Sequence, residues 1–146
     1  MARIPMNFQE VPSLEELKKA ASPGNYNVEA QSAGLSINPE GVVLSEVRWI
    51  IIDPGEFEGK AVPTRYYLGE AVLDEQGALV EIKRGQSDWG AALLKDAFDA
   101  CGVKIDVDRG PDTDDLLGKT CNALVSIAKT ETGRDFNRIE AYLPVA

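Results

Sequence analysis

Apolar and polar residues alternate with a period of two along most of the chain beyond residue 24, a pattern typical of β-strands with one buried face. Val28 and Ala30, for example, alternate with polar neighbours. Pro63 lies inside one such segment, and because proline has no N–H for a ladder it indicates an edge strand or a bulge there. The pattern predicts strands starting near residue 26 and over 42–52, 60–70, 119–129 and 134–143, with a small hairpin within 70–83.

A helical period replaces the strand period between residues 88 and 101. Apolar residues recur there every three or four positions, as on a helix with one buried face. Ser87 or Asp88 is suited to cap the N-terminus, and Gly102 follows the C-terminal end. We therefore expect one main helix over 88–101, followed by a single helical turn within 112–118.

The N-terminal region has neither period over a long stretch. Ser13 and Glu16 have the spacing of a capping box, which predicts a short helix beginning at about Leu14. Residues 1–22 are therefore expected to form an arm with a short helix, and residues 23–146 a single domain. Whether the arm contacts its own domain or a second subunit of a homo-oligomer stays open at this point.

The order of the elements predicts the fold. Five strands with a helix between the third and the fourth have the order of an OB-fold barrel. The expected fold class is therefore mainly β (α+β), a five-stranded OB-fold-like barrel with one capping helix. In such a barrel Trp89, Leu93 and Phe98 of the helix would plug the open end.

Composition excludes several classes of function. The chain has no histidine, which removes histidine-based acid–base catalysis and the commonest metal ligand. Cys101 and Cys121 are too few for a closed zinc site and are expected to be small buried apolar residues. No apolar run approaches the roughly 20 residues of a membrane helix, and no signal-peptide pattern opens the chain, so we expect a cytoplasmic protein that does not bind membranes.

Charge is distributed unevenly. The net charge is −9, which argues against a simple basic nucleic-acid binder, but residues 87–118 carry eight acids and only three bases. A solvated acidic face explains this segment without a ligand. Its aspartates do not match a calcium loop, because Arg109 and Pro111 break the spacing. No metal and no cofactor are expected.

Short motifs occur in seven segments of the chain, which are Pro23–Tyr26, Phe57–Lys60, Arg65–Leu68, Asp115–Lys119, Ala123–Ile127, Gly133–Ile139 and Tyr142–Pro144. These motifs resemble those of a bacteriophage and prophage family of small OB-like proteins encoded among replication and recombination functions. The resemblance implies a single-stranded-DNA-binding protein, accessory to DNA replication or recombination in the host cytoplasm, and not an enzyme. It also implies a replication or recombination protein as a further partner.

Binding single strands requires flat aromatic faces for bases and cations for phosphates. On the last strand Arg134, Phe136 and Arg138 share one face, because residues two apart point the same way. The alternative for Phe136 is a surface aromatic shielded by arginine stems. Together with Lys129 near the same turn, these residues form one half of the candidate site.

The other half lies on the second and third strands. Arg48 and Trp49 point to opposite faces, and the apolar neighbours of Trp49 favour Trp49 inward and Arg48 outward. Tyr66 is assigned to the core, and Tyr67 to the outer face with Arg65, although core packing is an alternative for both tyrosines. The candidate nucleic-acid-binding residues are therefore Arg48, Arg65, Tyr67, Lys129, Arg134, Phe136 and Arg138.

Two other classes of function compete with this interpretation. An acidic OB-like module, such as a phage inhibitor or an assembly component, would bind a protein partner and mimic nucleic acid through its negative surface. An enzyme is disfavoured by the absent histidines and the lack of a clustered nucleophile.

Overall fold

A computed structural model describes residues 2–11, 13–14, 19–85, 88–106 and 108–145. Within these ranges six strands form one antiparallel sheet in the order β4-β3-β2-β1-β5-β6. The elements are β1 (Gly24–Ile37), β2 (Val42–Ile51), β3 (Ala61–Leu73), β4 (Leu79–Lys83), α2 (Trp89–Ala100), the 3-10 helix η1 (Thr113–Leu116), β5 (Thr120–Lys129) and β6 (Asp135–Leu143). The predicted N-terminal helix falls mostly on residues 15–18, outside the described residues.

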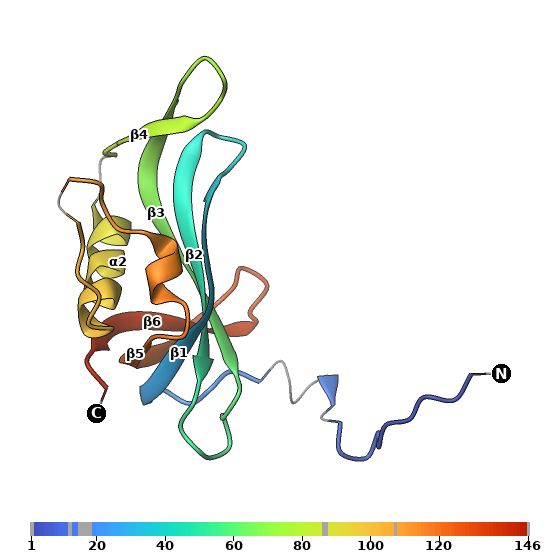
Figure 1. The fold of residues 1–146 in the computed structure, drawn as a ribbon. Helices are drawn as coiled ribbons and strands as arrows, with labels where there is room; N and C mark the ends of the chain where they lie inside the picture. Colours follow the sequence, from blue (N-terminus) through green and yellow to red (C-terminus); the bar gives the residue numbers. More distant parts are fainter. Residues whose placement is uncertain (1, 12, 15–18, 86–87, 107, 146) are drawn as a thin grey trace.

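The sheet curls into a half-barrel with α2 on its concave side (Figure 1). Helix α2 packs against both β3 and β6, which lie far apart in the strand order. Strand β3 pairs with β2, strand β6 pairs with β5, and among the described residues no ladder joins β3 to β6. The barrel is therefore open along a seam between β3 and β6.

The strand count corrects the expectation of five strands. The hairpin expected within residues 70–83 forms, and its second strand, β4, pairs with the far end of β3. Helix α2 consequently follows the fourth strand rather than the third. The architecture is mainly β and consistent with an OB-like fold, with β4 as an additional strand.

A bulge in β3 lies close to the point where pairing with β2 ends and pairing with β4 begins. The register between β2 and β3 shifts between Val43 and Leu44. Leu44 lies opposite Tyr67, whereas Val43 lies opposite Gly69. Gly69 has a φ of +143°, and a Cβ there would lie 2.2 Å from the carbonyl oxygen of Lys83. Only glycine permits this close approach, which turns the far half of β3 out of the barrel and onto β4. The extended β3–β4 hairpin rises beyond the barrel in Figure 1.

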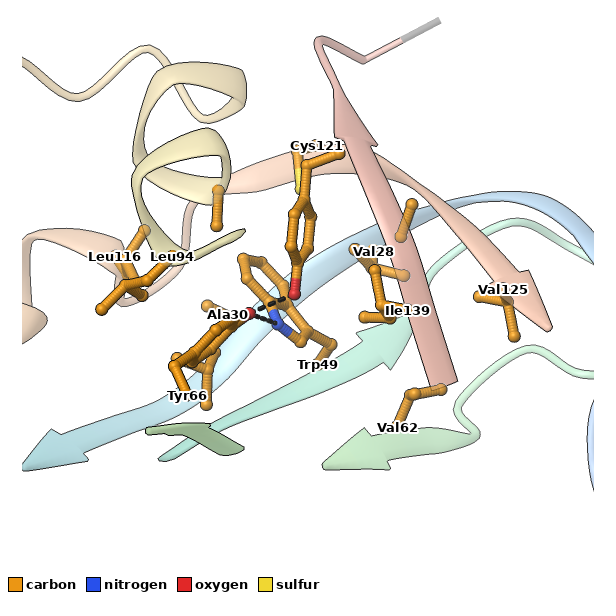
Figure 2. Packing of buried hydrophobic residues seen from close by; sticks show 14 of the residues in the cluster. Val28, Ala30, Trp49, Val62, Tyr66, Leu94, Leu116, Cys121, Val125 and Ile139 are labelled. Atoms are coloured by element: carbon orange, nitrogen blue, oxygen red, sulfur yellow. Dashed lines mark hydrogen bonds between the residues drawn. The ribbon is translucent and has the colours of Figure 1, made fainter. Parts of the chain in front are cut away.

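The core confirms the inward assignment of Trp49. Trp49 and Tyr66 are fully buried, and Trp49 Nε1–H donates to the Tyr66 hydroxyl at 3.1 Å (Figure 2). The Tyr66 hydroxyl also hydrogen-bonds the hydroxyl of Tyr142 on β6. Because buried polar groups are costly unless paired, this network satisfies the polar atoms that three large aromatic side chains bring into the core.

The prediction that α2 plugs the open end of the barrel is only partly correct. Leu94, Ala97 and Phe98 are buried in the core, but Trp89 is 64% exposed, so the expectation that Trp89 plugs the barrel is wrong. Asp88 occupies the N-cap position without a side-chain capping bond. Its carboxylate instead accepts from Arg84, with Nε at 3.1 Å. Within the described residues, no helix has both the length and the apolar character needed to cross a membrane.

Candidate functional site

A groove follows the open seam between β3 and β6. Its upper hollow, of about 640 Å³, lies beside the start of α2, and its lower hollow, of about 390 Å³, lies near the β5–β6 turn. The two hollows share Pro63, Phe136 and Asn137, so they adjoin each other along the seam, and we call the two together the seam groove. Its position follows from the missing ladder between β3 and β6.

Three exposed aromatic side chains line the upper hollow, each from a different element. Tyr67 of β3 is 52% exposed, Trp89 of α2 is 64% exposed and Phe136 of β6 is 41% exposed. Alternation along β3 sends Tyr67 outward while Tyr66 enters the core. Gly90 brings α2 against β3, because a Cβ there would lie 2.3 Å from the carbonyl oxygen of Tyr67. The absence of a side chain at Gly90 thus places Trp89 close to Tyr67.

The groove differs in charge from the rest of the chain. Arg65 and Arg138 line its upper hollow, and Lys60 and Arg134 line its lower hollow. Among the described residues that line the groove, Asp135 is the one carboxylate. Within the described part of the chain, four cations and one anion thus face the groove, whereas the net charge of the whole chain is −9. An excess of cations over carboxylates in one place attracts anions locally, even on a molecule whose net charge is negative.

Two of the groove's arginines are held by glutamates. Arg65 Nε lies 2.9 Å from Glu46 Oε1 on β2, and Arg138 Nε lies 3.8 Å from Glu140 Oε1. Among the described residues Arg134 has no ion-pair partner, and its backbone N–H donates to Thr130 Oγ1 at 3.1 Å. The three arginines of the groove are therefore of two kinds, namely two that are paired in the upper hollow and one in the lower hollow that has no ion-pair partner among the described residues.

The base of the groove is fixed by an amide clamp. Asn137 Oδ1 accepts from the backbone N–H of Ala21 at 2.9 Å, and Asn137 Nδ2 donates to the carbonyl of Ala21 at the same distance. Ala20 lines the lower hollow beside Lys60. Partial burial lowers the pKa of Lys60 from its usual value, because desolvation disfavours the charged ammonium. An anion in the lower hollow would offset this desolvation.

Most of the predicted binding residues meet at this groove. Arg65, Tyr67, Arg134, Phe136 and Arg138 line it. The remaining two candidates do not line the groove, although Lys129 pairs with Asp135, a carboxylate that does. Arg48 is exposed on β2 and donates from Nε to Gln31 Oε1 at 2.9 Å, and Lys129 Nζ lies 3.5 Å from Asp135 Oδ1.

The sequence interpretation missed Trp89 and Lys60. Trp89 fits the spacing of Leu93 and Phe98, which made it a core residue in prediction. On a helix of 3.6 residues per turn, however, it lies about a third of a turn from the centre of the buried face formed by Leu94, Ala97 and Phe98. A helical-wheel projection of α2 shows this offset of Trp89 from the buried face. Lys60 precedes its strand, and only the chain's path beside Ala20 brings it to the groove.

The remaining reactive groups do not form a second site. Cys101 and Cys121 are free thiols that hydrogen-bond each other, and Cys121 is fully buried. That hydrogen bond lowers the pKa of Cys101 and raises the pKa of Cys121. In the part of the chain that the structure describes, no three acidic or cysteine side chains converge on a metal-sized space. The seam groove is therefore the candidate functional site.

The assignment of the seam groove as the candidate functional site rests on the geometry. The chain matches no protein-family model, and no curated protein matches it in sequence.

Proposed function

We propose that this protein binds single-stranded DNA in the seam groove and serves as an accessory protein in DNA replication or recombination. The observation that carries the proposal is the meeting of three exposed aromatic faces and four cations in one groove of an acidic chain. Unpaired bases stack on Tyr67, Trp89 and Phe136, and the phosphates meet the cations of β3, β6 and the lower hollow.

The chemistry of the groove favours a single strand over a duplex. Stacking on a protein aromatic requires a base whose π-face is free, and in a duplex both faces are covered by neighbouring bases. The cations reach the backbone of either form, so they contribute affinity without selecting between them. The aromatic residues are therefore the selective component, and the role is binding rather than catalysis.

Fluorescence anisotropy with a labelled oligo-dT tests the proposal. Phe136→Ala should cost about 1–3 kcal/mol in affinity with little change in salt dependence, because stacking releases no counterions. Arg134→Ala should reduce the slope of log affinity against log salt by about 0.7, the single-strand value for one phosphate. Phe8→Ala and Arg109→Ala are matched controls, since neither residue lines the groove.

The outcomes separate the two functions considered. Equal affinities for wild type, Phe136→Ala and Arg134→Ala, with all three folded, would place the binding surface elsewhere. If wild type does not bind the oligonucleotide even at about 20 mM salt, where electrostatic attraction is strong, the proposal fails. In that case the acidic surface favours the alternative function, binding to a basic protein partner.

A further inference from the structure

We infer that Glu46 and Glu140 are built-in competitors of the bound strand, which occupy the arginines of the upper hollow and limit its affinity for single-stranded DNA. The inference rests on the proposed function and adds how affinity at that site is set. It follows from the contrast between the paired arginines of the upper hollow and the unpaired Arg134 of the lower hollow.

Glu46 is placed by strand register. It lies directly opposite Arg65 in the β2–β3 ladder, so the two side chains emerge on the same outer face. Arg65 Nε lies 2.9 Å from Glu46 Oε1, and about half or more of each side chain is exposed. A phosphate can therefore reach the same guanidinium from solvent.

Glu140 is held by a second contact. Its Oε1 atom accepts from Ser126 Oγ on β5 at 2.8 Å and lies 3.8 Å from Arg138 Nε. The serine hydroxyl keeps the carboxylate beside Arg138, where a strand in the groove would place its backbone. Neither glutamate lines the groove itself.

A carboxylate and a phosphate oxygen seek the same donors of a guanidinium, and both are anions. A phosphate that approaches a paired arginine must displace the carboxylate or accept repulsion from it. Arg65 and Arg138 therefore act as weaker phosphate sites than an unpaired arginine would. The glutamates supply a negative charge that a neutral isosteric side chain would lack.

The opposite effect is also physically conceivable, because a carboxylate can hold an arginine in the geometry that a ligand needs. The two roles predict opposite signs for removal of the charge. If the glutamates compete, their removal strengthens binding. If they position the arginines, their removal weakens it.

The test compares E46Q and E140Q with E75Q in oligo-dT titrations over a range of salt. Glu75 is exposed in the β3–β4 turn, away from the groove, so E75Q makes the same change in net charge without touching an arginine of the groove. We expect E46Q and E140Q each to bind roughly two- to five-fold tighter than E75Q, the range typical of an exposed ion pair. The salt slope should also become steeper by up to about 0.7.

A double-mutant cycle assigns the gain to the pair. In an R65A background, E46Q should give no more affinity than E75Q does, because the competed donor is gone. Weaker binding by E46Q and E140Q, or gains equal to that of E75Q, would overturn the inference while leaving the proposed function intact. Absence of binding by wild type and every variant at low salt would instead overturn both.

Discussion

Two groups of aromatic residues with nearly the same chemistry occupy opposite environments in this molecule. Trp49, Tyr66 and Tyr142 are buried in the half-barrel, whereas the aromatics of the seam groove are exposed. Tyr66 and Tyr67 are even neighbours in the chain. For these two neighbours the difference lies in the face of β3 on which each side chain stands, because Tyr66 points into the core and Tyr67 points outward into the groove.

The polar atoms of the buried group find their hydrogen-bond partners within the group. The Tyr66 hydroxyl accepts from the indole N–H of Trp49 and hydrogen-bonds the Tyr142 hydroxyl, and the rings of Trp49 and Tyr142 lie 5.5 Å apart between centroids. These contacts and the burial of the rings leave almost no surface of the three side chains accessible to a ligand. In the groove, by contrast, each aromatic side chain keeps a face accessible to a ligand. The comparison teaches that aromatic content alone does not identify a binding site in this chain.

The tryptophan pair gives the largest expected contrast. Trp49→Ala should lower the free energy of unfolding by about 3–5 kcal/mol, because it leaves a cavity and removes a donor from the core. Trp89→Ala should change stability by about 0.5 kcal/mol or less, since the side chain is mainly exposed. Urea denaturation measures both variants. Equal losses would show that Trp89 belongs to the core.

The tyrosine pair sharpens the same contrast within one strand. Tyr66→Phe should cost about 1–3 kcal/mol of stability, because Trp49 Nε1–H loses its acceptor and the Tyr142 hydroxyl loses a partner. Tyr67→Phe should leave both stability and base stacking nearly unchanged, since the ring remains. Denaturation of the two variants side by side checks this. A stable Tyr66→Phe protein would contradict the importance of the buried network.

Alkaline pH should act through the buried tyrosines. Burial raises the pKa of Tyr66 and of Tyr142 above the ordinary value near 10. Above that pH the unfolded chain loses protons that the folded chain keeps, so stability is full below about pH 10 and falls as pH rises. Each buried phenol contributes about 1.4 kcal/mol per pH unit. Denaturation midpoints across this range should fall less steeply for Tyr66→Phe than for wild type, and identical slopes would refute the account.

The smallest effect concerns the spacing between α2 and β3. Gly90→Ala places a Cβ 2.3 Å from the Tyr67 carbonyl oxygen, and the overpacking outweighs the better helix propensity of alanine by about 1 kcal/mol. Gly34→Ala is the control, because nothing lies within 4 Å of its added Cβ. Thermal melting compares the two variants. The shift of α2 should also weaken oligo-dT binding for Gly90→Ala, and unchanged binding would argue that the position of Trp89 is unimportant.

Local features were predictable wherever the chemistry lies within a single element. The strand and helix ranges follow from residue periodicity, and the opposite faces of Tyr66 and Tyr67 follow from alternation along one strand. The shared face of Arg134, Phe136 and Arg138 has the same origin. The sequence by itself therefore determined which face Trp49, Tyr66 and Tyr67 take, whereas on β2 and β5 runs of three consecutive buried residues depart from simple alternation.

Only the tertiary structure decided where those available residues meet. The seam between β3 and β6 brings together residues about seventy positions apart in the chain, and it depends on the curl of the whole sheet and on the packing of α2. The exposure of Trp89 depends on which side of α2 reaches the barrel. The pairing of Arg65 with Glu46 depends on strand register. Each of these results from contacts between distant segments, whose energies no local pattern of residues encodes.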